Sequence, residues 1–256
     1  MTTNIQNGSL YTSMQNNIAT IEFGHPASNS FPSELLQRLT KELNLISKND
    51  AISVIILKSE GEKTFCAGAS FDELVAISNL EEGKQFFAGF ANVINAMRTC
   101  GKIIIGRVQG KAVGGGVGIA AACDYVLATE NASIKLSEFT IGIGPFVIAP
   151  AVKRKIGVAG LSELTLDATS WQTAYWAKEK GLYAKVFETI KELDDEVVVL
   201  SSKLASYNTS ALAEMKKVLW ENTQNWDNLL AERAAISGEL VLSEFTKNGL
   251  AKFTKK

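Results

Sequence analysis

The chain has 256 residues, of which 46% are hydrophobic and 21% charged, and its formal net charge is −1. This is the balance of a globular protein with a sizeable core, and it lacks the basic excess typical of nucleic-acid or anionic-membrane binding. No apolar run has the length of a membrane span or of a signal-peptide core. Three widely spaced cysteines and one histidine suit neither a disulfide framework nor a metal site. We therefore expect a cytoplasmic protein with no bound metal, no nucleic-acid partner and no membrane partner.

Strand and helix patterns alternate through the first part of the chain. Alternation or short apolar runs predict strands at residues 18–23, 54–57, 103–108, 125–128 and 133–136. Helical spacing predicts helices at residues 31–46, 71–77, 81–97 and 114–122. Ser33 is the candidate cap of the first helix, residues 61–70 are expected to form a loop, and helical patterns dominate from about Val147. The order predicts an α/β fold of repeated strand–strand–helix units followed by a helical tail.

Three consecutive glycines, Gly114 to Gly116, connect a predicted buried strand to a predicted helix. Such a junction leaves backbone N–H groups open at the positive end of a helix, with no side chain in the way. The donors suit an oxygen that gains negative charge during a reaction, or a phosphate. A dinucleotide site fits poorly because Ile119 occupies the position of the third glycine in the fingerprint. The remaining alternative is that the small residues only permit tight packing of strand and helix.

A second small-residue loop, which includes Ala67, Gly68 and Ala69, also follows a predicted buried strand. Two such loops side by side in a sheet would present two backbone N–H groups to one oxygen. This arrangement is an oxyanion hole for a carbonyl that becomes an enolate.

Glu138 is an isolated acid between a predicted apolar strand and a turn at Gly142. Removal of the carboxylate from water would raise its pKa toward a value useful for proton transfer. The alternative is an ordinary loop carboxylate that caps a nearby N–H group.

Taken together, these segments resemble the enoyl-CoA hydratase/isomerase (crotonase) superfamily over nearly the whole chain. The similar segments lie at residues 21–29, 65–69, 109–124, 132–138, 174–186 and 245–256. The resemblance implies a crotonase-like spiral of ββα units with a CoA-ester site in residues 1–200 and a helical trimerisation region in residues 201–256. It also implies an acyl-CoA thioester substrate, a homotrimer or a dimer of trimers, and no separate cofactor, because CoA is part of the substrate.

The resemblance assigns roles to individual residues. It implies that Glu138 is catalytic and that Ala69 and Gly115 supply the two oxyanion N–H groups. Residues expected to contact the substrate are Ala67, Gly68, Gly114, Gly118, Phe253 and Lys256, with Phe253 near the adenine and Lys256 near a phosphate of CoA.

The chain also departs from the family pattern. The second glutamate of the two-glutamate hydratases falls on Gly118, where we expect a gap. Ser70 and Asp72 stand where an aspartate and a lysine are common, which leaves the CoA phosphate contacts open. The aryl-CoA dehalogenases have a nucleophilic aspartate in the loop that corresponds to the one around Gly142. Phe146 stands near that position in this chain, which excludes their chemistry. The resemblance therefore favours an enoyl-CoA double-bond isomerase or a one-glutamate hydratase. A non-enzymatic crotonase-fold binding or scaffold protein is the alternative.

Overall fold

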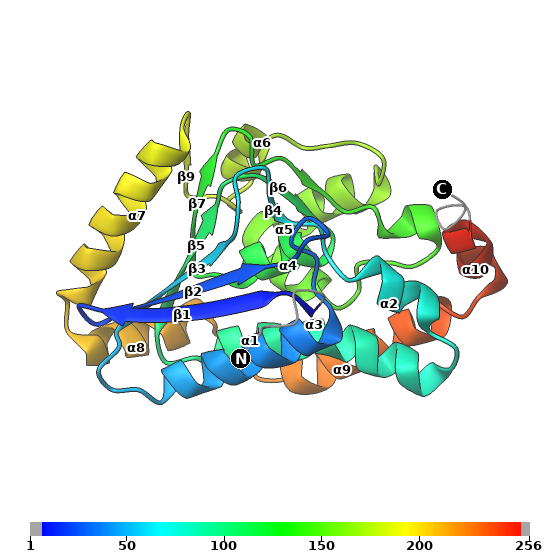
Figure 1. Ribbon diagram of the computed structural model, residues 1–256, viewed down its shortest axis with the longest axis horizontal. Coiled ribbons are helices and arrows are strands. Elements are labelled where there is room, and N and C mark those ends of the chain that lie inside the picture. The colour runs from blue at the N-terminus through cyan, green and yellow to red at the C-terminus, as the bar shows by residue number, and fades with distance from the viewer. Residues whose placement is uncertain (1–6, 252–256) are drawn as a thin grey trace.

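The larger of the two sheets has six strands in the order β1-β2-β3-β5-β7-β9 (Figure 1). The computed structural model describes residues 7–251. Only β1 and β2 pair antiparallel, and the other neighbours are parallel. The strands of this large sheet are β1 (Ser9–Gln15), β2 (Ile18–Gly24), β3 (Val54–Ser59), β5 (Ile103–Val108), β7 (Tyr125–Thr129) and β9 (Lys185–Phe187).

A second, three-stranded parallel sheet has the order β4-β6-β8. Its strands are β4 (Thr64–Cys66), β6 (Lys111–Val113) and β8 (Ile134–Lys135). Consecutive strands form three pairs: β3/β4, β5/β6 and β7/β8. In each pair the first strand belongs to the large sheet and the second to the small sheet. Helical segments follow each pair, so the predicted repeat of strand–strand–helix units is confirmed.

The helices cover both faces of the large sheet. Figure 1 shows α7 along one face, with α1, α3 and α9 together on the other side. The helical elements are α1 (Ser33–Ser47), α2 (Phe71–Ala76), α3 (Leu80–Thr99), α4 (Gly115–Ala122), the 3₁₀ helix η2 (Glu138–Ile141), α5 (Ala149–Leu166), α6 (Ala174–Glu179), α7 (Ile190–Ala205), α8 (Thr209–Leu219), α9 (Trp226–Leu240) and α10 (Glu244–Ala251). Within residues 7–251, none of them is long and apolar enough to cross a bilayer.

Burial on both faces explains the uninterrupted apolar runs of the central strands. Val54 and Ile56 of β3 belong to a cluster with Val197 of α7. The alternate residues, Ile55 and Leu57, point into the main core with residues of α1 and α3. A parallel strand that is covered on both sides must be apolar at consecutive positions rather than at every second one.

Several local expectations differ from the structure. Ser33 does not cap α1, because it is already the first helical residue and Pro32 stands at the cap position. The Ser33 backbone N–H and hydroxyl donate instead to Glu73 Oε2, at 2.9 and 2.6 Å. The expected loop at 61–70 contains β4, and β9 lies in the region expected to be helical. The boundary at residue 200 stays a prediction, and α7 runs across it.

A buried ionic network ties the C-terminal helices to the large sheet at Asp124. Its Oδ2 accepts hydrogen bonds from the backbone N–H of Ile104 at 2.8 Å and from Lys216 Nζ at 2.6 Å. Its Oδ1 accepts from Trp220 Nε1 at 2.7 Å. The side chains of Asp124 and Lys216 are only 2% and 3% exposed. Arg154 and Lys155 also interact with the charge of Asp124.

We predict that Lys216→Met lowers the free energy of unfolding by about 3–5 kcal/mol, because it removes the cation that is hydrogen-bonded to the buried Asp124 carboxylate. Urea denaturation measures the change. The matched control is Lys217→Met on the same helix. Lys217 forms an ion pair with Glu214, and the two side chains are 72% and 70% exposed. The control is expected to change stability by less than about 0.5 kcal/mol. Equal stabilities of the two variants would contradict the structural role of the buried pair.

Candidate active site

The three strands of the small sheet end at one edge, and a cavity opens there. The segments that follow β4, β6 and β8 bring Ala67 to Ala69, Val113 to Gly115, and Ser137 with Glu138 to this cavity. Its volume is about 180 Å³, close to the ~150 Å³ of an apolar cavity that holds one benzene molecule. Parallel strands place their carboxyl ends at the same edge of a sheet, where ligands commonly bind. The two glycine-bearing loops and Glu138, far apart in sequence, therefore meet at one site.

Two backbone N–H groups at this cavity have no partner in the described part of the chain. Ala69 and Gly115 both line the cavity, and neither N–H donates to another residue of 7–251. An ideal Cβ at Gly68 would lie 3.5 Å from the Gly115 nitrogen, which shows how closely the two loops approach. Gly115 is also the first residue of α4, whose positive end favours an anionic oxygen. The arrangement has the donors that an oxyanion hole requires.

Each of the three consecutive glycines meets a separate steric requirement. Gly114 has φ +53°, and an ideal Cβ there would lie 2.9 Å from Glu138 Oε1. A Cβ at Gly115 would lie 2.3 Å from the Phe90 ring, and one at Gly116 would lie 2.5 Å from the Cys66 carbonyl oxygen. The segment therefore permits tight packing and also leaves the N–H groups open, so the two interpretations of its glycines are compatible.

Glu138 begins η2 three residues after the last residue of β8, and its carboxylate lies against Gly114. A turn with Gly142 at φ +83° closes η2, where the N–H of Ile143 donates to the Glu138 carbonyl oxygen at 3.2 Å. An ideal Cβ at Gly142 would lie 2.5 Å from the Phe245 ring of α10. The C-terminal helix thus supports the turn that carries Glu138.

The environment of the Glu138 carboxylate disfavours its charged form. The residue as a whole is half-buried, but Oε2 is buried and has no hydrogen-bond partner within residues 7–251. Glu138 is the one ionisable side chain among the described residues that line the cavity. Desolvation raises the pKa of Glu138 from 4.5 to about 7, against a smaller lowering by the backbone N–H groups of Glu138 and Ser137. A carboxyl with a pKa near neutrality is suited to accept and return a proton.

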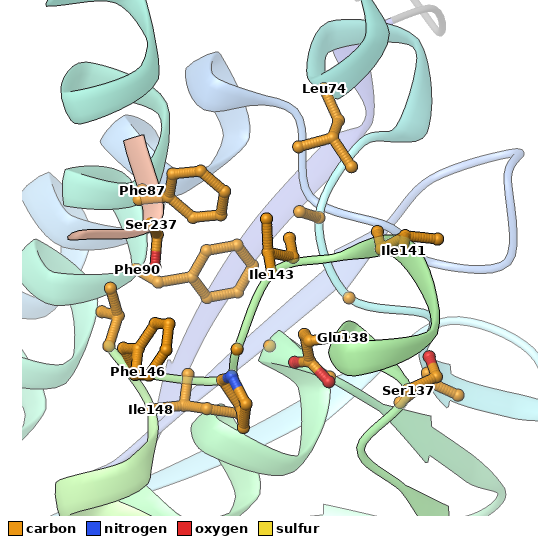
Figure 2. Close-up of a pocket in the computed structure, with 18 of the residues that line it drawn as sticks. Leu74, Phe87, Phe90, Ser137, Glu138, Ile141, Ile143, Phe146, Ile148 and Ser237 are labelled. Atoms are coloured by element: carbon orange, nitrogen blue, oxygen red, sulfur yellow. The ribbon is translucent and has the colours of Figure 1, made fainter. Parts of the chain in front are cut away.

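The rest of the wall was not predicted, and it is apolar apart from Ser237. α3 contributes Phe87 and Phe90, the segment before α5 contributes Phe146 and Ile148, and α9 contributes Ser237 (Figure 2). The α3 phenylalanines follow the helical apolar pattern in sequence, which marks a buried face but not a cavity. For α9, the small residues Ser237 and Gly238 were the available signal, because small residues indicate close approach of a neighbouring helix.

The expected gap beside Gly118 does not exist. Gly118 is buried in α4 and does not line the cavity. An ideal Cβ at Gly118 would lie 2.3 Å from Ile148 Cγ2 and 2.6 Å from Ile148 Cβ. The space expected to be open is filled by Ile148, whose side chain forms part of the cavity wall instead (Figure 2).

The predicted CoA contacts are only partly within the described chain. Phe253 and Lys256 lie outside residues 7–251, so their expected roles stay predictions. Ser70 caps α2 by accepting a hydrogen bond from the backbone N–H of Glu73 at 3.4 Å. Asp72 lies in the first turn of the same helix, where a negative charge is favourable.

Comparison with known proteins identifies relatives over nearly the full length. A family model described as enoyl-CoA hydratase/isomerase matches residues 13–256. A probable enoyl-CoA hydratase of Bacillus subtilis is 26% identical, with 93% of each chain covered. A peroxisomal Delta(3,5)-Delta(2,4)-dienoyl-CoA isomerase of Arabidopsis thaliana is 29% identical over 70% of this chain and 68% of the relative. The crystal structure of an enoyl-CoA hydratase from Bacillus halodurans has the same fold, with a TM-score of 0.88, 22% identity and coverage of 95% of this chain and 99% of that one.

We predict that Gly118→Ala lowers the free energy of unfolding by about 1–3 kcal/mol, because the new methyl group overpacks against Ile148. Urea denaturation measures the effect. The double variant Gly118→Ala/Ile148→Ala is expected to lose less stability than the sum of the two single variants, because the two sites are coupled.

The control for this substitution is Gly101→Ala, where an added Cβ meets nothing within 4 Å. It is expected to change stability by less than about 0.5 kcal/mol. A Gly118→Ala protein as stable as the Gly101→Ala protein would show that the space beside Gly118 is open after all.

Proposed function

The chain belongs to the enoyl-CoA hydratase/isomerase family of enzymes that act on CoA thioesters, and we propose that it moves the double bond of an enoyl-CoA. In this proposal Glu138 carries the proton, and the N–H groups of Ala69 and Gly115 hold the thioester oxygen. The observation that carries the proposal is the single desolvated carboxylate beside two open backbone donors in one cavity.

The proposed reaction needs one base and one oxyanion site. Glu138 removes a proton from C2 of a 3-enoyl thioester, and the electron pair moves onto the thioester oxygen as an enolate. The N–H groups of Ala69 and Gly115 stabilise that negative charge without a change in their own positions. The protonated Glu138 then returns its proton to C4, which places the double bond between C2 and C3. The carboxylate ends the cycle in its starting form.

Hydration by a single glutamate is the second candidate function, since hydratases and an isomerase both occur among the relatives. Two-glutamate hydration needs a second carboxylate to hold and activate water. Gly118 supplies none, and Ile148 fills the adjoining space. Among the described lining residues, no ionisable side chain other than Glu138 is present. These observations favour isomerisation, with hydration requiring that other groups hold the water.

We predict that Glu138→Gln lowers kcat by about 10²–10⁴-fold on the best 3-enoyl-CoA or 2-enoyl-CoA substrate and leaves thioester binding nearly intact. The amide keeps the shape of the side chain but cannot accept a proton. In the wild type, kcat/KM is expected to fall as the pH drops below about 7, because the carboxyl of Glu138, with its pKa of about 7, is then protonated.

The matched control is Glu130→Gln, an exposed glutamate after β7 that does not line the cavity. It should retain the activity and the pH profile of the wild type. More than about a tenth of wild-type activity in Glu138→Gln would refute its role as the proton carrier. A protein that binds CoA thioesters but converts neither substrate panel would instead favour the binding or scaffold alternative.

Self-association as a homotrimer or a dimer of trimers is part of this proposal, as is a cytoplasmic location. Met215, Val218 and Leu219 of α8 expose apolar side chains, which a subunit contact would cover. We expect sedimentation to give the mass of a trimer or of its dimer, and Val218→Glu to shift the protein toward smaller species. A wild-type protein that sediments as a monomer over a range of concentrations would contradict this assembly.

A further inference from the structure

Ser237 places a hydroxyl group without a partner in the wall of the active-site cavity. The residue is 1% exposed, and its Oγ has no hydrogen-bond partner within residues 7–251. A buried hydroxyl that forms no hydrogen bond destabilises the folded state. The labelled lining residues near Ser237 in Figure 2 are the aromatic Phe87, Phe90 and Phe146.

The position of Ser237 follows from the close packing of α9 against α3. An ideal Cβ at Gly83 would lie 2.7 Å from the Gly238 carbonyl oxygen, so the two helices touch along their backbones. The contact brings the residue before Gly238 to the cavity. Figure 2 shows Ser237 across the cavity from Glu138, with its oxygen directed toward the rings of Phe90 and Phe146.

We propose that Ser237 selects acyl chains that carry a neutral hydrogen-bonding oxygen, a hydroxyl or carbonyl group, at the part of the chain remote from the thioester. This inference rests on the proposed function, because it assumes that the acyl chain enters this cavity with its thioester near Ala69 and Gly115. The serine hydroxyl can donate to a carbonyl and can donate to or accept from a hydroxyl. A purely hydrocarbon chain would leave Ser237 unpaired, whereas an oxygen at the matching position would satisfy it.

The cavity also excludes a charged chain end. Its described lining residues include no lysine, arginine or histidine. A terminal carboxylate would therefore be buried without a cation and in the same cavity as Glu138, which is unfavourable on both counts. The class of substrate is thus an oxygenated but uncharged acyl chain.

The experiment compares pairs of CoA thioesters that have equal numbers of chain atoms and differ only in a terminal methyl or hydroxyl group. A third series carries a terminal carboxylate. Over a series of chain lengths, kcat/KM is measured for the wild type, for Ser237→Ala and for Ser201→Ala. Ser201 is the matched control because it is equally buried, lies in α7 and donates to the Val198 carbonyl oxygen at 3.2 Å.

At the chain length that spans the cavity, the wild type is expected to prefer the hydroxyl-ended thioester by roughly 5–10-fold. Ser237→Ala should abolish or reverse this preference, and Ser201→Ala should keep it. The carboxylate-ended series should be the poorest for every protein. An unchanged preference in Ser237→Ala, or a wild type that prefers the methyl-ended partner at every length, overturns the inference.

Binding of the saturated analogues separates this inference from the proposed function. Calorimetry on saturated thioesters needs no turnover. A wild type that binds the hydroxyl-ended analogue more tightly, with the difference lost in Ser237→Ala, supports the role of Ser237 even where no enoyl-CoA is converted. Equal affinities for both analogues in the wild type overturn it, whatever the activity. Ser237→Ala is also expected to melt at a temperature no lower than the wild type, and a fall of about 2–4 °C or more would show that the hydroxyl serves packing instead.

Discussion

The contact between the Glu138 carboxylate and the backbone of Gly114 is the constraint on which the site depends. An ideal Cβ on residue 114 would lie 2.9 Å from Glu138 Oε1, and the backbone of residue 114 has φ +53°. Glycine is the residue that satisfies both conditions without strain. The carboxylate is therefore held beside the open N–H of Gly115 in a cavity whose described lining offers no cation. Burial of the carboxylate at this site raises the pKa of Glu138 to about 7.

The large sheet anchors the fold, and two buried polar atoms without partners lie at the cavity. The large sheet is buried on both faces, and Asp124 ties α8 to it through a buried ion pair. At the cavity, Glu138 Oε2 and Ser237 Oγ are buried without partners in the described chain, as are polar atoms of Arg38, Gln109 and Arg154 elsewhere. The two oxygens at the cavity stay without partners only while the surrounding residues keep water away from them. The small sheet places Glu138 at the cavity, and the glycine contact between α3 and α9 places Ser237 there.

Features set by local pattern could be predicted from the sequence, and features set by distant packing could not. The apolar runs at 54–57, 103–108 and 125–128 correspond to central strands because burial on both faces leaves a signal in consecutive residues. The strand β1 was missed because its residues are mostly exposed and lack that signal. The space beside Gly118 was misjudged because Ile148, thirty positions away, fills it. Ser237 and Gly238 indicate only that a neighbouring helix comes close, and the role of Ser237 in the cavity wall depends on residues that are distant in sequence.

The central claim is that the cavity desolvates Glu138 enough to make it a proton carrier near neutral pH. The most direct measurement is an infrared pH titration of the carboxyl group, taken as the difference between the wild type and Glu138→Gln. We expect one carboxylic-acid band in the difference spectrum, which disappears with a matching gain of carboxylate as the pH rises through a pKa of about 7. A Glu138 band that titrates near 4.5, the ordinary value for a glutamate, would contradict it.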